Sequence, residues 1–419
     1  MFTTVCAAAL AGAEGDLAQP PGLCAATGIL TVRNTSSSRV GAQQKEGHLL
    51  TSRVRPVFWG GLGRFTQFRI PVLLRVGAGN LLAFAEGRPS RRDYGEIRLV
   101  LRRSIDGGRS WQPLEQVQLN TSNAAFGEGR MTLSNPVPVY LPPSTLLLLF
   151  CTSPAHASES DIRSGRAKRH VWRTISHNLG RNFSTPVEIS RQVMGTNFTW
   201  FATGPGGALR LADGTLLVPA TYAELGVAGG RDHSTVLASY DGGLSWQRGS
   251  AADPGTNEAT IARLPNGSLL LNARTTGRHG LANDRRTLQL SLEQGRGWSP
   301  AWYALRQPRN RPGFPKGCHG SMVAAAGRLW FVGPDAPVAR ANLTLAVSHD
   351  GGVHWSTYAL LHEGPAGYSS LVVQPGERSL ALLAETGIGK EHYATRILSA
   401  QVRLDCTRDA RMAPPSLEA

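Results

Sequence analysis

The chain has 419 residues, of which 41% are hydrophobic and 17% charged, with 48 glycines and 26 prolines. This composition excludes a disordered or fibrous protein and is typical of a turn-rich globular chain, with one large all-β domain or two ordinary ones. The formal net charge of +15 comes mainly from arginines spread along the whole chain, with no basic run interleaved with stacking aromatic residues. We therefore predict no nucleic-acid partner. The charge leaves two explanations open, attraction of an anionic substrate or a general bias toward arginine.

The N-terminal segment, residues 1–56, has no periodic pattern, and we expect a linker or tail. Its start, Met1 to Gly15, is small and apolar but has no basic residues, so it resembles a signal peptide only weakly. Six Asn-x-Ser/Thr sequons favour a secretory route, extracellular or lysosomal, with the cytoplasm as the alternative. No apolar run reaches the length of about 18 residues that suggests a transmembrane segment. Five cysteines without C-x-x-C spacing predict no metal site, and the oligomeric state stays unknown.

Two repeated signals begin near Val57. A hairpin turn followed by an apolar strand occurs six times, at 77–80, 142–144, 213–214, 266–267, 326–327 and 375–376. Each of the first five is followed by a Ser-x-Asp-Gly-Gly-type box. The boxes are Ser104–Trp111, Ser239–Trp246 and Ser348–Trp355, with degenerate copies at Ser176–Phe183 and Ser291–Trp298. Each unit therefore predicts a hairpin, a third strand, a box turn and a fourth strand.

Such units in tandem indicate an all-β fold, a six-bladed β-propeller of four-stranded antiparallel blades. We place it at residues 57–405, followed by a C-terminal tail at 406–419. The sixth unit has only one recognisable strand after its hairpin, so we expect residues just before Phe68 to supply the missing outer strand. A two-sheet sandwich is the alternative, but it does not explain six matched hairpins.

Strands of a blade run alternately up and down, so the start of the first strand, the end of the second and the start of the third share one face. This rule brings nine polar residues to one face near the axis. They are Arg69, Glu86, Arg88, Asp93, Glu258, Arg274, Arg340, Tyr368 and Glu385. Each one alone is typical of a solvated strand end, but their convergence favours a functional site. The boxes fall on the opposite face, and we interpret them as blade turns.

The residue types on this face suggest a chemistry. Guanidinium groups bind carboxylates through paired hydrogen bonds and stay charged, which makes a carboxylate ligand the expectation for three of them, Arg69, Arg274 and Arg340. Glu385 is suited to hold one of these arginines. Three others have the residue types of a nucleophile, a base and an acid: Tyr368, Glu258 and Asp93.

The boxes, Phe68-Arg69-Ile70-Pro71, Leu82 to Arg88 and Gly364 to Ser370 resemble the exo-α-sialidase (neuraminidase) family, most of all its bacterial and animal lysosomal branches. The resemblance extends from about residue 60 to residue 404. It implies hydrolysis of terminal sialic acid from glycoproteins, oligosaccharides and gangliosides, without a metal or organic cofactor. Sialylated glycans are thus the expected partners.

The resemblance also implies roles for single residues. Arg69, Arg274 and Arg340 match the family's arginine triad on the sugar carboxylate, and Glu385 matches the acid that steadies the first arginine. Tyr368 matches the nucleophile, Glu258 its activating carboxylate and Asp93 the acid/base on a mobile loop. Arg88 resembles the arginine beside the C4 substituent, and Glu86 and Asn135 are assigned to the same pocket.

Two other functions fit parts of this pattern. Asp boxes also occur in propellers without hydrolase activity, so a non-catalytic glycan-binding protein is one alternative. A trans-sialidase, which passes the sugar to another glycan in place of water, is the other. The set of Tyr368, Glu258 and the triad favours an enzyme, because a scaffold has no reason to keep it.

Overall fold

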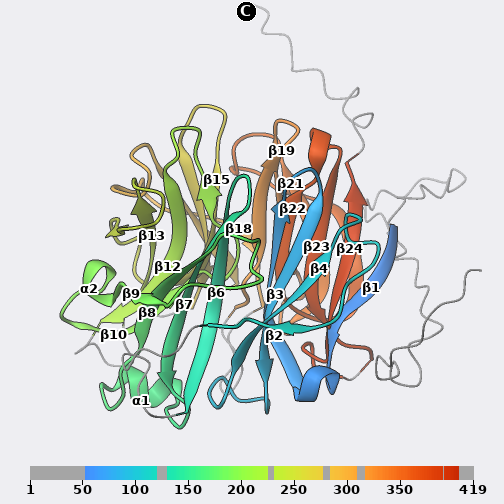
Figure 1. Ribbon diagram of the computed structural model, residues 1–419. Helices are drawn as coiled ribbons and strands as arrows, with labels where there is room; N and C mark the ends of the chain where they lie inside the picture. The colour runs from blue at the N-terminus through green and yellow to red at the C-terminus, as the bar shows by residue number, and fades with distance from the viewer. Residues whose placement is uncertain are drawn as a thin grey trace, which may run out of the picture.

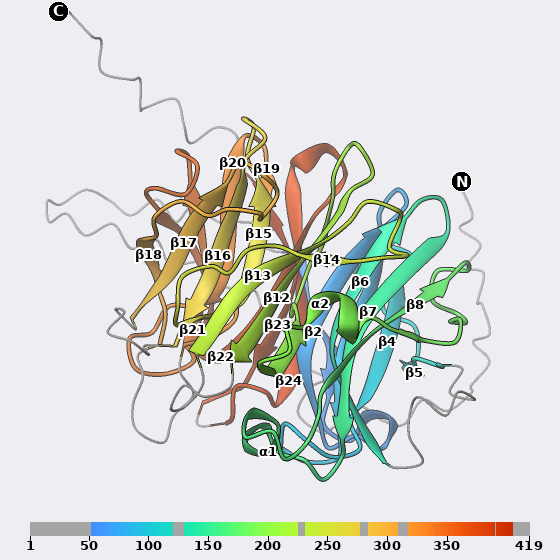
Figure 2. The ribbon, with the colours of Figure 1, turned by 90° about the vertical axis from the view of Figure 1, so that its left-hand side faces the viewer.

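The computed structural model describes residues 52–119, 130–224, 231–276, 284–308, 317–389 and 391–404. Within them the chain forms antiparallel sheets arranged side by side, with strands that run roughly vertically in Figures 1 and 2. Two short helices, α1 (Glu159–Arg163) and α2 (Ser190–Val193), lie in connections between strands. No helix in these ranges is long and apolar enough to span a membrane.

Four sheets each contain a four-stranded meander. The first consists of β2 (Gln67–Val76), β3 (Asn80–Arg88), β4 (Arg98–Ser104) and β5 (Glu115–Gln116). The second consists of β6 (Met131–Leu141), β7 (Thr145–Pro154), β8 (His170–Ser176) and β9 (Val187–Glu188). The third consists of β10 (Phe198–Thr203), β12 (Leu216–Glu224), β13 (Arg231–Ser239) and β14 (Gln247–Arg248), with β11 (Leu209–Arg210) beside β12. The fourth consists of β15 (Thr256–Arg263), β16 (Leu269–Thr275), β17 (Arg285–Ser291) and β18 (Trp302–Arg306).

The remaining strands form one continuous seven-stranded sheet in the order β1, β24, β23, β22, β21, β20, β19. Its members are β1 (Ser52–Trp59), β19 (Ser321–Ala325), β20 (Arg328–Pro334), β21 (Ala341–Ser348), β22 (Ser356–Val373), β23 (Ser379–Thr386) and β24 (Arg396–Arg403). The prediction of six four-stranded blades is therefore wrong. The described residues form four separate blades of this kind, and β1 and β19 to β24 share one sheet.

The reason for this difference lies in β22, which runs for 18 residues without a turn. Its first half pairs with β21 and its second half pairs with β23. The strand passes through Gly364-Pro365-Ala366-Gly367, although glycine and proline usually interrupt strands. In this segment the Ala366 amide donates to the Arg340 carbonyl at 2.9 Å and the Gly387 amide donates to the Pro365 carbonyl at 3.0 Å. These bonds on both sides keep the segment extended.

The two ends of the described chain meet in this sheet. Strand β1 pairs antiparallel with β24, so residues before Phe68 do supply an outer strand, as expected. Strand β1 begins at Ser52, which means that the predicted domain start at residue 57 falls inside it. Because the first and last strands pair directly, the ring is closed by backbone hydrogen bonds.

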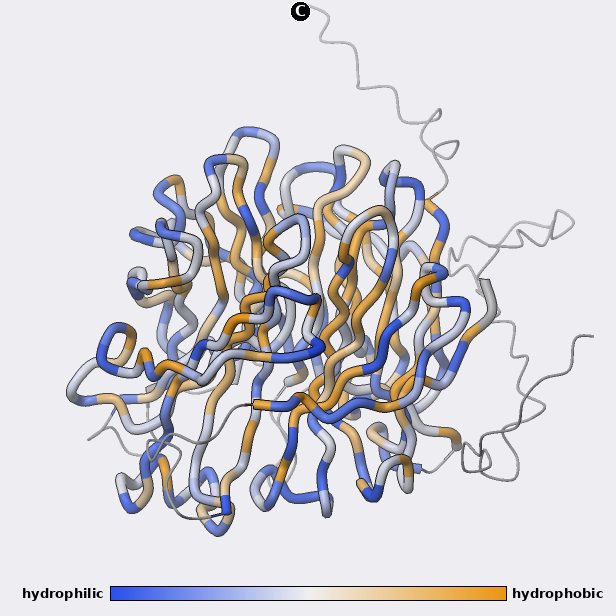
Figure 3. Tube along the Cα trace, viewed as in Figure 1, coloured by the Kyte–Doolittle hydropathy of each residue, from blue (hydrophilic) through white to orange (hydrophobic). Residues whose placement is uncertain are grey.

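Apolar side chains pack between neighbouring sheets. One cluster joins Phe84 of the first blade to Leu148 and Trp172 of the second, and another joins Phe68 to Leu383 of β23. Figure 3 shows apolar residues along the strands and mainly polar residues in the loops at both ends. Burial of apolar surface thus holds the sheets together, and the strand ends stay available for polar function.

The five boxes are hydrogen-bonded turns. In each of them the serine hydroxyl accepts from the amide of the glycine four residues later, at 2.7 to 2.8 Å in the first three and at 2.8 and 2.9 Å in the last two. In the first blade Ser104 pairs with Leu81 at the start of β3, whereas Arg88 ends the same strand. Seven residues of strand separate them, roughly 23 Å. The boxes therefore lie opposite the predicted site and act as turns.

We expect Gly243→Ala to destabilise the fold by about 3 kcal/mol or more. Gly243 has a φ of 93°, and a Cβ there would lie 2.4 Å from Cδ2 of Leu147 in the preceding blade. The adjacent Gly242, with a φ of 72° and no atom within 4 Å of an added Cβ, is the matched control. Gly242→Ala should cost only about 1 kcal/mol, since backbone strain acts alone. Urea unfolding measures both, and equal losses would contradict tight packing at this turn.

Candidate active site

The strand ends opposite the boxes enclose a cavity of about 340 Å³, lined by residues from all five sheets. Helix α1 contributes to its wall and marks this end of the molecule in Figures 1 and 2. Nine of the ten residues predicted from the sequence line it: Arg69, Glu86, Arg88, Asp93, Asn135, Glu258, Arg274, Arg340 and Tyr368. The tenth, Glu385, is fully buried behind Arg69. The structure thus brings the whole predicted set together.

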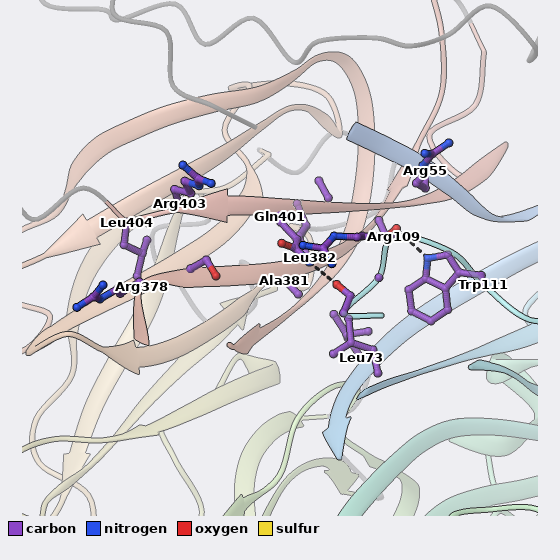
Figure 4. A pocket seen from close by; sticks show the side chains of 16 residues that line it. Arg55, Leu73, Arg109, Trp111, Arg378, Ala381, Leu382, Gln401, Arg403 and Leu404 are labelled. Carbon is purple, nitrogen blue, oxygen red and sulfur yellow. Dashed lines mark hydrogen bonds between the residues drawn. The ribbon is translucent and has the colours of Figure 1, made fainter. Parts of the chain in front are cut away.

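A larger cavity, of about 1030 Å³, lies between the first blade and strands β23 and β24 (Figure 4). Its charged lining residues are all arginines, namely Arg55, Arg109, Arg378 and Arg403. None of the predicted site residues lines it, and neither does any carboxylate or phenol among the described residues. The carboxylates and the phenol of the predicted chemistry line the smaller cavity instead.

The three predicted arginines are each fixed by a different partner. The Arg69 Nε donates to Glu385 Oε1 at 2.8 Å, and the Arg274 Nη1 donates to Glu258 Oε2 at 2.6 Å. The Arg340 guanidinium donates to the Gly317 carbonyl at 3.1 Å and to the Tyr393 hydroxyl at 2.9 Å. Burial alone would lower the pKa of Arg69, but the charge of Glu385 raises it well above its usual value. The cavity therefore holds a permanent cluster of positive charge.

The buried Glu385 side chain connects strands β2 and β22 through its hydrogen bonds. Its Oε1 accepts from Arg69 Nε and from the Ile70 amide at 2.9 Å, and its Oε2 accepts from the Tyr368 amide at 3.0 Å. These bonds join β2 to β22, which are far apart in sequence. A buried carboxylate needs such partners, because it would otherwise lose its hydration without compensation. One residue thus positions both Arg69 and the backbone of Tyr368.

Tyr368 and Glu258 are in direct hydrogen-bond contact in the cavity. The Tyr368 hydroxyl lies 2.6 Å from both carboxylate oxygens of Glu258 and accepts from Arg274 Nη1 at 3.2 Å. Burial and the charge of Glu258 raise the pKa of Tyr368 well above its usual value, although the three arginines oppose this. Burial would also raise the pKa of Glu258, but the charge of Arg274 and the hydrogen bond from Tyr368 lower it. The resting pair is a neutral phenol that donates to an ionised carboxylate.

Asp93 lies at the mouth of the cavity, with 68% of its side chain exposed. Its Oδ1 is 2.5 Å from Arg88 Nη1 and 3.6 Å from Arg69 Nη1. Partial desolvation would raise the pKa of Asp93, but the charges of Arg88, Arg69 and Arg340 lower it overall. The carboxyl is thus ionised at rest, and it is held by arginines that face the cavity.

Glu86, Arg88 and Asn135 form a linked group on one side of the cavity. The Arg88 guanidinium donates to Glu86 Oε2 at 2.9 and 2.5 Å, while Glu86 Oε1 accepts from the Asn135 amide at 2.8 Å. Asn135 has a φ of 54° and accepts from Arg169 through its side-chain oxygen at 2.6 Å. Its left-handed backbone turns the chain so that both contacts form at once.

The adjoining wall of the cavity consists of residues that were not among the predicted site residues. Trp200 packs against two guanidinium groups, with Arg169 4.3 Å and Arg163 5.3 Å from its ring centre. Arg163 also pairs with the buried Asp232 at 2.7 Å. Arg169 lies just before β8, the third strand of its blade, so the strand-end rule would have found it. Arg163 had no such signal, because it belongs to a helix inside a loop.

A family model described as "BNR repeat-like domain" matches residues 71–379, which is most of the chain. The exo-alpha-sialidase of Aspergillus fumigatus is 28% identical over 372 residues, covering 80% of this chain and 83% of that protein. Sialidase-2 of Rattus norvegicus is 32% identical over 274 residues, covering 61% of this chain and 68% of that protein.

Solved structures show the same fold. The structure of the Hadza microbial sialidase Hz136 superposes with a TM-score of 0.69 at 22% identity, covering 81% of this chain. The matched part is 66% of that protein's chain, so this chain spans just under two thirds of its length. Together with the family model and the relatives above, this places the chain in the family of BNR-repeat sialidases, which are glycoside hydrolases.

Proposed function

We propose that this chain is an exo-α-sialidase that releases terminal α-linked sialic acid from glycoproteins, oligosaccharides and gangliosides with retention of configuration. The observation that carries the proposal is the contact of 2.6 Å between the Tyr368 hydroxyl and both oxygens of Glu258. A glycan-binding propeller without catalysis would use the arginines, but it has no need for a buried phenol hydrogen-bonded to an ionised carboxylate.

The arginine cluster supports recognition of the sugar carboxylate. Hydrogen bonds to charged groups contribute about 1.5 to 3 kcal/mol each, so three guanidinium groups can provide most of the affinity for one anion. Their partners, Glu385, Glu258 and the Gly317 carbonyl, orient them before the substrate arrives. Such preorganisation reduces the entropy lost on binding.

A tyrosine suits this reaction because the anomeric carbon of sialic acid carries a carboxylate. A carboxylate nucleophile would approach that carbon against like charge, whereas a neutral phenol does not. In our proposal the Tyr368 oxygen attacks the anomeric carbon while its proton passes to Glu258. The bond to the aglycone breaks, and the leaving oxygen takes a proton from Asp93, whose carboxyl takes up this proton when the sugar carboxylate binds at Arg69.

The second step releases the sugar. Asp93 removes a proton from water, the water oxygen attacks the anomeric carbon, and the bond to the Tyr368 oxygen breaks. The phenolate then recovers its proton from Glu258. Two displacements at one carbon retain its configuration, as in other retaining glycosidases. Transfer of the sugar to a glycan hydroxyl in place of water is the trans-sialidase alternative.

Binding of free sialic acid is expected to take up a proton at acidic pH. The charges of Arg88 and Arg69 lower the pKa of Asp93 in the free protein, so its carboxyl is ionised there. A ligand carboxylate on Arg69 weakens this attraction, and the pKa of Asp93 then rises. Between the two pKa values the bound state holds the extra proton, so binding strengthens as pH falls through that window.

Calorimetry in two buffers with different ionisation enthalpies measures this proton uptake. Asp93→Asn is the matched control, because it keeps the size of the side chain and removes the titrating carboxyl. We expect uptake in the wild type and none from this position in the variant. Equal uptake by both proteins would show that another group titrates.

A fluorogenic α-sialoside assay, run from acidic to neutral pH, tests the proposed function. Folded wild-type protein should release the fluorophore, and proton NMR should show the retained anomer of sialic acid first. Binding of the sialoside without release would favour a glycan-binding protein. Formation of a new sialoside when lactose is added, at the expense of free sialic acid, would favour the trans-sialidase.

We also infer a secretory route, extracellular or lysosomal. Three sequon asparagines are exposed in the structure, Asn182, Asn197 and Asn266, while Asn34 and Asn120 lie outside the described residues. A decrease in mass after treatment of the cell-derived protein with an N-glycosidase would support this route. An unshifted protein recovered from the cytoplasm would contradict it.

A further inference from the structure

The buried side chain of His319 lies beside the Tyr368 ring and has no part in the chemistry proposed so far. His319 immediately precedes Gly320 and strand β19, and only 2% of it is exposed. Its ring centre is 5.4 Å from that of Tyr368, and the two planes are tilted by 51°. On another side, a Cβ added to Gly206 would lie 3.2 Å from His319 Nε2. The imidazole thus fills the space between the third blade and the nucleophile.

Hydrogen bonding does not explain the position of this ring. Neither Nδ1 nor Nε2 of His319 has a hydrogen-bond partner among the described residues. Burying polar atoms without hydrogen-bond partners costs free energy of folding. An apolar side chain of the same size would fill this space without that cost. Because no described hydrogen bond fixes the ring, contact with Tyr368 and the room left by Gly206 determine its place.

The ring is also uncharged at working pH. Burial lowers the pKa of His319 to about 3, with Arg286 and Arg274 acting in the same direction and Glu258 against them. These three are the charged groups that act on the imidazole. A protonated ring would place a further cation beside Glu258 and make its carboxylate a weaker base. A neutral ring packs against Tyr368 without making the Glu258 carboxylate a weaker base.

We propose that His319 is a positioning residue for the nucleophile, whose neutral side chain packs against the Tyr368 ring and holds its hydroxyl within hydrogen-bonding reach of Glu258. This inference rests on the proposed function of Tyr368. Displacement of a reacting group by about 1 Å can lower a rate by about 10²-fold, so loss of the packed side chain should reduce turnover. It should leave affinity nearly unchanged, because His319 does not line the cavity where the sugar binds.

Two substitutions at this position separate packing from a general loss of structure. His319→Ala removes the contact, and His319→Gln restores a neutral side chain of similar volume. We expect kcat of His319→Ala to fall roughly 10- to 100-fold, with KM within about 3-fold of wild type. His319→Gln should recover kcat to within a few-fold, and its pH profile should superimpose on that of the wild type. Circular dichroism at the assay temperature verifies that each variant is folded.

Each other outcome has a defined meaning. A folded His319→Ala protein with wild-type kcat would overturn the inference, and so would a rise in KM that accounts for the whole loss. A shift of the acidic limb of the profile in His319→Gln would show that the imidazole titrates during catalysis, which contradicts a neutral support. An inactive wild-type protein would instead refute the proposed function, since it does not depend on His319.

Discussion

Tyr368→Phe is expected to lower turnover of an α-sialoside by roughly 10³-fold or more, on the scale seen when a covalent nucleophile is removed. The phenylalanine keeps the ring that lies 5.0 Å from the Arg69 guanidinium and 5.4 Å from that of Arg340. Only the hydroxyl that contacts Glu258 is lost. KM should therefore change by only a few-fold, because the arginines that bind the carboxylate stay in place.

Tyr393→Phe is the matched control for this substitution. The Tyr393 ring also lies beside both Arg69 and Arg340, at 5.4 and 5.0 Å, and its hydroxyl accepts from Arg340 at 2.9 Å. Because its described hydrogen bond goes to an arginine and not to Glu258, this variant should affect KM more than kcat. Initial rates over a range of substrate concentrations separate the two constants. Wild-type turnover by Tyr368→Phe would make the assigned nucleophile wrong.

Arg69→Ala is expected to lower both substrate affinity and stability. The substitution leaves the fully buried Glu385 with two backbone amides and no cation. Breaking a buried ion pair by removing one partner costs about 3 to 5 kcal/mol in stability. The loss of one arginine from the carboxylate site should raise KM at least 10-fold, since a charge-assisted hydrogen bond contributes about 1.5 to 3 kcal/mol.

Two variants distinguish the loss of binding from the loss of folding. Arg340→Ala removes a half-buried arginine whose described partners are the Gly317 carbonyl and the Tyr393 hydroxyl, so it should raise KM with a smaller loss of stability. Replacement of both Arg69 and Glu385 by apolar residues should restore much of the stability, because no buried charge is left unpaired. It should not restore binding. Urea unfolding and KM measurements test both points, and a double variant as unstable as Arg69→Ala would contradict this explanation.

The sequence predicted those features that depend on neighbours along the chain. Turn chemistry is local, and the spacing of serine, aspartate and glycine in the boxes therefore predicted hydrogen-bonded turns that the structure contains. Strand alternation is local as well. From the order of the strands we predicted that Arg69, Glu258 and Tyr368 lie at the same end of the blades. All three line one cavity in the structure.

The division into sheets could not be predicted in the same way. The repeat units predicted separate blades on either side of residues 364–367, yet this segment stays extended because its backbone bonds to residues 340 and 387. Those partners come from other strands, so their effect on β22 is not visible in the local sequence. The count of separate four-stranded blades was wrong for this reason.

The sequence by itself thus determined the all-β repeat, the opposite placement of boxes and site residues, and the residue types of the chemistry. Only the tertiary structure decided which groups touch. The ion pair of Arg69 with Glu385 joins positions 316 residues apart, and the contact of Tyr368 with Glu258 joins positions 110 residues apart. Such pairs form only when the ring of sheets is closed, and their distances and burial then determine which carboxylates are ionised and which phenol stays neutral. The same closure buries His319 beneath the nucleophile, where no local pattern pointed to it.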